Sequence, residues 1–257
     1  MKSALIGHTG FVGSTLKAQC HFDDYYRSGN ISDMAGKRYD LIVCAGAPGQ
    51  KWLANKHPEE DRQSLARLMD ALGHASAGHV VLISTIDVYP TPIGVDEETP
   101  IRSEEGHPYG RHRLQLEGFV TARFEATVVR LPGLFGEGLK KNIIFDLLND
   151  NMVDVINPRS VVQFYGLESL WSDISKVREL GLPLVNFATE PVRVADLASE
   201  AFGRTLGNNP AAHPAVRYDM KTLHGHRLGG FEGYLQNAQS VMRQIEAFVE
   251  SQRLREQ

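Results

Sequence analysis

The stretch SALIGHTGFVGS, residues 3–14, decides the fold of this chain. Its first four residues predict a short buried strand, and glycines follow at Gly7, Gly10 and Gly13, where the strand turns into a helix. Glycine suits such a turn because a Cβ would block both the tight backbone and the approach of a phosphate to the backbone N–H groups. The alternative is an ordinary glycine-rich turn, which the preceding strand and the following helix disfavour. The stretch therefore predicts a phosphate-binding turn.

Outward from this turn, apolar runs alternate with amphipathic stretches, which is typical of βαβ units on a parallel sheet. Leucines at helical spacing after Pro58 predict one crossover helix. The fold class expected is α/β, with a Rossmann-like doubly wound parallel sheet. The predicted strands are Ser3–Ile6, Tyr39–Ala45, His79–Ser84, Ala126–Leu131 and Leu184–Phe187, with a weaker one that ends near Tyr26.

The alternation stops after Pro132, where three glycines mark loops. Helices are predicted beyond it over residues 142–148, 192–202 and 238–248. We expect a single Rossmann-type domain over residues 1–257, with a small C-terminal substrate-binding lobe built mainly from about residues 132–170 and 203–236.

Composition excludes several classes of protein. The chain has 257 residues, 42% of them hydrophobic, and a formal net charge of −4, so no broad cationic field is available for nucleic acid or an anionic membrane. Cys20 and Cys44 are too few for a disulfide framework, and His224 and His226 are better explained as loop histidines than as metal ligands. We expect a cytoplasmic protein that binds a small molecule and has no metal site.

Four further motifs follow in order: LIVCAGAP at residues 41–48, LISTIDVY at 82–89, YGRHR at 109–113 and RLPGLFG at 130–136. With the Gly-x-x-Gly-x-x-Gly turn, they resemble the extended (atypical) short-chain dehydrogenases/reductases of the NAD(P)-dependent epimerase/dehydratase branch, from Lys2 to roughly Leu197. The resemblance implies an NAD(P)-dependent oxidoreductase or epimerase that acts on a nucleotide-activated sugar or a similar hydroxyl or carbonyl metabolite.

The resemblance also implies catalytic roles for Thr85, Tyr109 and Arg113. Tyr109 corresponds to the general acid/base of the family's Tyr-x-x-x-Lys, with Arg113 where lysine is expected, and Thr85 holds the substrate oxygen. Tyr109 and Arg113 share a helix face, so the arginine is expected to lower the pKa of the phenol. Asp61 stands where the family commonly has asparagine and receives no role. Taken singly, Thr85, Tyr109 and Arg113 are better explained as a strand-end cap, a packed surface aromatic and a solvated helix charge, and only the motifs taken together and in order favour the functional interpretation.

Two sets of contacts complete the expected site. The nicotinamide cofactor is expected to contact Gly7, Thr9, Gly10, Phe11, Val12, Gly13, Arg27, Ser28, Ala45, Gly46, Ala47, Ser84, Tyr109, Arg113, Leu131 and Pro132. The substrate, expected to be anionic, is assigned to Asp87, Arg130, Lys140, Lys141 and Asn142, although solvated loops explain the lysines equally well.

NADP is slightly favoured over NAD because the second strand ends in Tyr26-Arg27-Ser28 and not in an acidic residue. Asp23 or Asp24 would supply that acid if the strand were in a different register.

Two alternatives concern function and assembly. Arg113 and Asp61 would permit a non-catalytic NAD(P)-binding redox sensor or assembly subunit. The family's usual assembly implies a homodimer through the helices after Pro58 and Tyr109, although their apolar side chains could instead pack on the sheet. The candidate dimer residues are Leu114, Leu116 and Phe119.

Overall fold

The computed structural model describes residues 1–207 and 210–255, which form two compact units. Unit 1 comprises Met1–Pro90, Thr99–Leu131 and Ser169–Asn186. Unit 2 comprises Thr91–Glu98, Pro132–Glu168 and the described chain from Phe187 onward.

Unit 1 is built on a six-stranded sheet with the order β10-β6-β4-β3-β1-β2, in which every neighbouring pair is parallel. The chain places β2 on one side of β1 and then crosses to the other side for β3, so the strand order reverses at β1. The predicted Rossmann-like α/β fold is confirmed. The strands are β1 (Ser3–Ile6), β2 (Asp24–Tyr26), β3 (Arg38–Cys44), β4 (Ser76–Thr85), β6 (Ala126–Leu131) and β10 (Leu184–Asn186).

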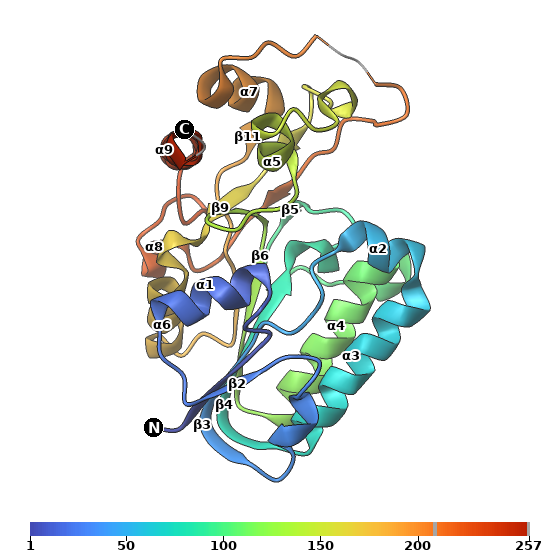
Figure 1. Ribbon diagram of the computed structural model, residues 1–257, viewed down its shortest axis with the longest axis vertical. Helices are drawn as coiled ribbons and strands as arrows, with labels where there is room; N and C mark the ends of the chain where they lie inside the picture. Colours follow the sequence, from blue (N-terminus) through green and yellow to red (C-terminus); the bar gives the residue numbers. More distant parts are fainter. Residues whose placement is uncertain (208–209, 256–257) are drawn as a thin grey trace. The chain divides into compact units, whose positions relative to one another are not determined.

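Helices cover both faces of this sheet, which explains why the strands are continuous apolar runs. Helices α3 (Pro58–Gly73) and α4 (Pro108–Arg123) lie on one face, and α1 (Phe11–Gln19) and α6 (Leu170–Glu179) lie on the other (Figure 1). Leucines of α3 and α4 pack against the central strands in one core. That core includes Ile6, Ile42, Val80, Leu82, Leu65, Leu68, Leu72, Leu116 and Val120.

The strands agree closely with the predicted ones, and their largest difference has a local cause. β1 and β6 have the predicted bounds, whereas β4 begins at Ser76, before the predicted His79. Ser76 and Ala77 pair with Arg38 and Tyr39 of β3 although this part of β4 is not apolar. Backbone pairing with a neighbouring strand therefore extends β4 beyond its hydrophobic run.

The predicted dimer residues occupy different environments. Leu116 is 1% exposed in the unit 1 core, and Phe119 packs against that core. Leu114 is half-buried. The homodimer stays a prediction, with Leu116 already used for packing on the sheet.

Unit 2 has its own hydrophobic core and only short strands. Its strands pair as β7 (Gly133–Phe135) with β9 (Phe164–Gly166), β8 (Val161–Val162) with β11 (Val192–Arg193), and β5 (Ile93–Val95) with β12 (Asp219–Met220). Its helices are α5 (Ile143–Leu148), α7 (Val194–Phe202), α8 (Gly225–Leu228) and α9 (Ala238–Arg255). Ile144, Leu197, Val241 and Ile245 are fully buried in its core. Across the described chain, no helix is both long enough and apolar enough to span a membrane.

Gly110 marks the tightest packing of α4 on unit 1. A Cβ at Gly110 would lie within 3.0 Å of the backbone carbonyl of Asp87, in the 3-10 turn η2 (Ile86–Val88) that follows β4. Gly118, further along the same helix, has no heavy atom within 4 Å of the same position. The first turn of α4 therefore needs a glycine, whereas its middle does not.

We predict opposite effects for the two alanine substitutions. Gly110→Ala should lower the free energy of unfolding by about 1–3 kcal/mol, because either the helix or η2 must shift. Gly118→Ala should raise it by up to about 1 kcal/mol, because alanine loses less backbone entropy than glycine in a helix. Urea unfolding followed by circular dichroism measures the free energy of unfolding of both variants. Equal changes in that free energy would contradict the close approach of Gly110 to the Asp87 carbonyl.

Candidate functional site

The glycine turn lies at the carboxyl end of β1, where the strand order reverses. Gly7 has φ +85°, and a Cβ there would lie within 3.0 Å of the Ala45 carbonyl at the end of β3. A Cβ at Gly13 would similarly meet the Gly7 carbonyl. Both glycines are therefore required by the fold itself. In open α/β sheets, ligands bind in the crevice beside such a reversal of strand order.

Gly10 differs from its two neighbours because space is open beside it. The nearest atom to a Cβ at Gly10 is the Gly7 carbonyl oxygen at 3.4 Å, an ordinary contact, and Gly10 is exposed. Gly10 is also the N-cap of α1, with no side-chain capping bond and no acidic residue in the first turn. The first N–H groups of this helix, from Phe11, Val12 and Gly13, can therefore bind an anion that approaches over Gly10.

The end of β2 lies beside the same turn, because the Gly7 N–H donates to the Tyr26 carbonyl at 2.8 Å. Arg27 and Ser28 follow and are exposed. The possible alternative acids are used elsewhere: Asp23 accepts a hydrogen bond from the Ser3 N–H, and Asp24 accepts one from the Tyr39 hydroxyl. The strand therefore ends in the register that the sequence predicted.

The loop after β3 forms the other side of the crevice. Ala45, Gly46 and Ala47 are half-buried, and the Ala45 N–H donates to the Ile6 carbonyl at 2.9 Å. A Cβ at Gly46 would lie within 3.0 Å of the Ile6 side chain. These three residues and the glycine turn are thus brought together, and Thr9 lies exposed within the turn.

Thr85 and Tyr109 are also brought together, from the end of β4 and the first turn of α4. Thr85 lies close enough to Tyr109 to lower the pKa of its phenol, and the Thr85 hydroxyl accepts the Asp87 N–H at 3.2 Å. Tyr109 is only 8% exposed. A hydroxyl and a phenol held in this way can bind and protonate one oxygen atom of a ligand.

Arg113 is stacked on Tyr109, and both of its terminal nitrogens bond protein groups. Its Cζ lies 3.9 Å from the centroid of the Tyr109 ring. Its terminal nitrogens donate to both carboxylate oxygens of Asp61, at 2.5 and 2.8 Å, and to the carbonyls of Tyr109 and Pro48. Asp61, which received no role from the sequence, is therefore the ion-pair partner of Arg113.

The pKa of Tyr109 differs from the expectation. Burial raises the pKa of the phenol above its ordinary value of 10.0, and the opposing influences of Arg113, Thr85 and Lys51 do not overcome it. Arg113 does lower this pKa, as expected, but its influence is smaller than that of burial, so the pKa does not fall below its ordinary value. The physical reason is the burial of the phenol, which outweighs the influence of the Arg113 charge.

Helix α2 (Lys51–Lys56) contributes two contacts whose roles the sequence did not show. Lys51 Nζ forms an ion pair with Asp87 Oδ1 at 2.7 Å, and Asn55 Oδ1 accepts the Tyr109 N–H at 3.1 Å. The two residues are four apart, so they share one helix face. The four-residue spacing of Lys51 and Asn55 was visible in the sequence. Their contact with η2 and the first turn of α4 was not, because those segments are distant in the chain.

His107 caps α4 and is a further neighbour that the sequence analysis missed. Its Nδ1 accepts the Gly110 N–H at 3.1 Å. Burial, helped by Lys51, lowers the pKa of its imidazole below 6.5. The signal available in the sequence was His107-Pro108, because proline is common in the first turn of a helix.

Two predicted residues, Ser84 and Arg130, belong to a buried network instead of lining an open site. Ser84 Oγ donates to Glu117 Oε1 at 2.5 Å, and Arg130 donates to both Glu117 oxygens and to the Tyr89 hydroxyl. Arg130 is 4% exposed and Glu117 is 5% exposed. Arg130 is thus not presented to a phosphate, and Leu131, which follows it, is also buried.

The remaining predicted residues lie in unit 2. Lys140 and Lys141 are exposed, and Pro132 is buried. Asn142 is the N-cap of α5: its Oδ1 accepts the Phe145 N–H and its Nδ2 donates to the Leu134 carbonyl. Its polar atoms therefore stabilise a helix end, a role that differs from the predicted contact with substrate.

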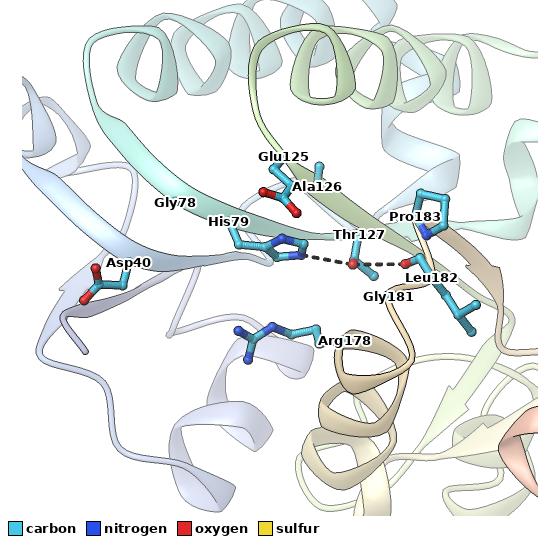
Figure 2. A pocket seen from close by; sticks show the side chains of 10 residues that line it. All are labelled: Asp40, Gly78, His79, Glu125, Ala126, Thr127, Arg178, Gly181, Leu182 and Pro183. Atoms are coloured by element: carbon cyan, nitrogen blue, oxygen red, sulfur yellow. Dashed lines mark hydrogen bonds between the residues drawn. The ribbon is translucent and has the colours of Figure 1, made fainter.

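A cavity of about 410 Å³ in unit 1 is lined by none of the predicted site residues (Figure 2). His79, Arg178 and Thr127 line it, near the amino ends of β4 and β6. Ligands of open α/β sheets bind at the carboxyl ends, so this cavity is not the candidate site. In the part of the chain that the structure describes, no group of three or more histidine, cysteine or acidic side chains could hold a metal ion.

Comparison with known proteins supports the fold. No protein-family model matches the chain, and no curated protein matches it. Among solved structures, MoeE5 in complex with UDP-glucose and NAD has a TM-score of 0.73 at 17% identity, over 100% of both chains.

Two further structures give the same result. The UDP-glucose 4-epimerase of Thermotoga maritima, with UDP-glucose, has a TM-score of 0.71 at 14% identity over 100% of both chains. RMD from Pseudomonas aeruginosa, complexed with NADPH, has a TM-score of 0.71 at 17% identity over 98% of this chain and 100% of its own. The chain therefore shares the fold of these solved structures, in agreement with the Rossmann-like fold that the sequence predicted.

The Asp61–Arg113 pair predicts a pH dependence of stability. Burial raises the pKa of the Asp61 carboxyl, but its bonds to Arg113 and His112 outweigh burial and hold the pKa below 3.8. A carboxyl whose pKa is depressed in the folded state stabilises the fold above its unfolded pKa, and this contribution is lost as pH falls through the folded pKa. At pH 7, Asp61→Asn should therefore cost on the order of 3 kcal/mol, because Arg113 stays buried without a counter-charge.

Urea unfolding at several pH values measures this difference. The gap between wild type and Asp61→Asn should narrow as the pH falls below about 3.8. Asp70→Asn is a matched control on the same helix, since Asp70 is exposed. A gap that is constant with pH would contradict the ion pair as its source.

Proposed function

We propose that this protein is an NAD(P)-dependent enzyme of the extended short-chain dehydrogenase/reductase kind, acting on a nucleotide-activated sugar or a similar hydroxyl or carbonyl metabolite. One observation carries the proposal: two features lie at the carboxyl edge of the same parallel sheet. The first is the open glycine turn after β1, where the strand order reverses, and the second is Thr85 at the end of β4 with its neighbour Tyr109. The first is suited to a dinucleotide and the second to proton transfer.

The glycine turn fits a dinucleotide by two criteria. The first is space: a ligand phosphate can occupy the open volume beside Gly10 into which the Cβ of any other residue would project. The second is charge: the start of α1 has no side-chain cap, so its free N–H groups and the positive end of the helix dipole can bind that phosphate. Ala45, Gly46 and Ala47 would line the adenosine side. When bound, the nicotinamide would supply hydride transfer.

Tyr109 and Thr85 would handle the proton. In the reducing direction, the Tyr109 phenol donates its proton to the substrate carbonyl oxygen while the Thr85 hydroxyl holds that oxygen, and the product is an alcohol. In the oxidising direction, a Tyr109 phenolate takes the proton of the substrate hydroxyl. Burial raises the pKa of Tyr109, which makes its phenolate, the form needed in the oxidising direction, harder to form.

The substrate class is proposed from two sources. MoeE5 and the T. maritima epimerase are described with UDP-glucose, so nucleotide sugars suit proteins of this fold. On this chain, the exposed Lys140 and Lys141 of unit 2 would attract an anionic substrate. Asp87 would contact the substrate beside Thr85.

For the cofactor, we propose a preference for NADP over NAD. Arg27 and Ser28 are exposed at the end of β2, and no carboxylate takes their place, because Asp23 and Asp24 are bonded elsewhere. An arginine suits a ribose 2′-phosphate, whereas an acid suits a ribose 2′-hydroxyl.

A non-catalytic NAD(P)-binding sensor or assembly subunit remains the second candidate. The Asp61–Arg113 ion pair favours it, because both terminal nitrogens of the residue at the family's lysine position already bond protein groups. Transfer of hydride from C4-labelled NADPH to any nucleotide sugar or carbonyl compound separates an enzyme from a sensor, since the sensor binds cofactor and transfers nothing.

Cofactor binding gives the first prediction for the function. Gly10→Val should leave the fold intact but weaken NADPH and NADH binding at least tenfold, because the valine side chain fills the open space beside the turn. Fluorescence titration measures the affinity. Gly118→Val is the control, since it makes the same change at an exposed site with no neighbours within 4 Å. Unchanged affinity in a folded Gly10→Val protein would mean that the cofactor binds elsewhere or not at all.

Turnover gives the second prediction. Tyr109→Phe removes the phenol oxygen but keeps the ring that stacks on Arg113, so it should lower kcat at least a hundredfold while NADPH affinity changes less than threefold. Steady-state kinetics with the substrate found by the labelled-hydride screen measures both. Normal turnover by a folded Tyr109→Phe enzyme would remove Tyr109 from the mechanism.

A further inference from the structure

The cavity near the amino ends of β4 and β6 contains a chain of hydrogen bonds that orients His79 (Figure 2). The Thr127 hydroxyl donates to the Leu182 carbonyl at 3.1 Å, and its oxygen lies 3.0 Å from His79 Nε2. A carbonyl oxygen can only accept and a hydroxyl has a single hydrogen, so His79 Nε2 must donate to Thr127. Thr127 is 1% exposed, which shields this chain of bonds from solvent.

His79 therefore offers a hydrogen-bond acceptor to the cavity. Burial, helped by the Arg178 charge, lowers the pKa of its imidazole below 6.5, and Glu125 acts in the opposite direction. The ring is neutral at pH 7, and because Nε2 carries the hydrogen, Nδ1 keeps a lone pair. None of the residues that the structure describes donates a hydrogen bond to Nδ1.

Arg178, in the last turn of α6, is the cation of this cavity. Its Nε is buried, and its guanidinium makes no hydrogen bond or ion pair with any residue in the described ranges 1–207 and 210–255. A basic residue at a helix C-terminus often interacts with the helix dipole alone. That role does not explain a buried, unbonded N–H, which is costly, or a side chain directed toward the space below the His79 ring (Figure 2).

Glu125, just before β6, supplies a carboxylate on the other side of His79 (Figure 2). It is exposed, and its carboxylate makes no ion pair with Arg178 or with any other described residue. The second acid of the cavity, Asp40, accepts the Lys2 N–H at 2.6 Å. The cavity wall thus carries a separated positive and negative charge, and both act on the neutral imidazole.

We propose that this cavity binds a small zwitterion of the amino-acid class, at a site separate from that of the cofactor and substrate. The ligand carboxylate would accept from the terminal N–H groups of Arg178, whose fork matches two carboxylate oxygens. The ligand ammonium would donate to His79 Nδ1 and face Glu125. A ligand that carries both charges satisfies the arginine and the acid together, which a simple anion cannot do.

The size and lining of the cavity suit such a ligand. Its volume of about 410 Å³ lies in the range of small-molecule sites, so it has room for an amino acid with a side chain. Leu182 and Pro183 also line it and would contact apolar parts of the ligand. The glycine turn lies at the carboxyl edge of the same sheet, so both ligands can bind at once.

The test titrates the intact protein with each natural L-amino acid and follows the histidine side chains by ¹⁵N NMR. The resonance missing from His79→Gln identifies His79 among the 10 histidines. Without ligand, Nε2 should carry the hydrogen and Nδ1 should not. At least one amino acid should shift the Nδ1 resonance saturably, with a Kd on the order of 1 mM. A His79 that carries its hydrogen on Nδ1, or that no amino acid shifts at about 50 mM, overturns the proposal.

Two analogues of the best amino acid test the need for both charges. The carboxylic acid that lacks the amino group and the amine that lacks the carboxyl group should each bind at least tenfold more weakly. Equal affinity for the carboxylic acid, or tighter binding of inorganic phosphate, would show a simple anion site and would contradict the zwitterion.

Two variants identify the groups that bind. Arg178→Met should weaken amino-acid binding at least tenfold, and Arg67→Met is the matched control, since Arg67 is exposed on α3. Glu125→Gln should weaken binding of the amino acid more than that of the carboxylic acid. Equal affinities of the two arginine variants would overturn the site. Should Arg178→Met fail to fold, Glu125→Gln decides, because an unchanged preference for the amino acid contradicts the proposal.

Addition of NADPH distinguishes this site from the proposed function. Saturating NADPH should change the Kd of the amino acid less than about twofold, because the two ligands occupy opposite edges of the sheet. Mutual exclusion of the two ligands would contradict a separate site. If the amino acid binds and NADPH does not, the proposed function fails and the zwitterion site stands.

Discussion

The close approach of β1 and β3 at their carboxyl ends is the constraint on which the candidate site depends. Parallel pairing brings Ile6 beside Cys44, and the backbone of Gly7 then lies so close to the Ala45 carbonyl that no side chain fits. The Gly7 carbonyl in turn leaves no room for a side chain at Gly13, which sets the start of α1. Sterics therefore shape the turn before any ligand binds. Only at Gly10 does the missing side chain leave open space, and that space lies beside the unsatisfied N–H groups of the helix.

Buried charges around the carboxyl ends of the strands are balanced locally, and this balance ties helices to the sheet. Glu117 of α4 meets Arg130 of β6, and Arg113 of the same helix meets Asp61 of α3. Such ion pairs contribute little net stability compared with apolar packing. Breaking one is nevertheless costly, because it leaves an uncompensated charge buried, so each pair restricts the position and rotation of α4 on the sheet. Tyr109 occupies the first turn of this same helix. Its orientation is therefore a consequence of ion pairs further along α4 as much as of its own contacts.

The two residues that depart from the family pattern that the sequence resembles form one feature in three dimensions. Asp61 and Arg113 look like independent changes in the sequence, yet they bind each other through two hydrogen bonds. An asparagine with a lysine carries one net positive charge, whereas an aspartate with an arginine carries none. The replacement thus removes a charge beside Tyr109 while preserving a polar link between α3 and α4.

The sequence by itself determined the parallel α/β fold, the glycine turn and the location of Thr85 and Tyr109 at the ends of a strand and the start of a helix. These features follow from local periodicity and from the backbone demands of glycine, both of which can be seen within a dozen residues. Tertiary structure alone decided two ion pairs. Asp61 pairs with Arg113, 52 residues away in the chain, and Lys51 pairs with Asp87, 36 residues away. It also decided that Arg130 is buried and that the pKa of Tyr109 is raised. Ion pairing and burial depend on how each helix is rotated against its neighbours, and that rotation is set by packing between segments far apart in the chain.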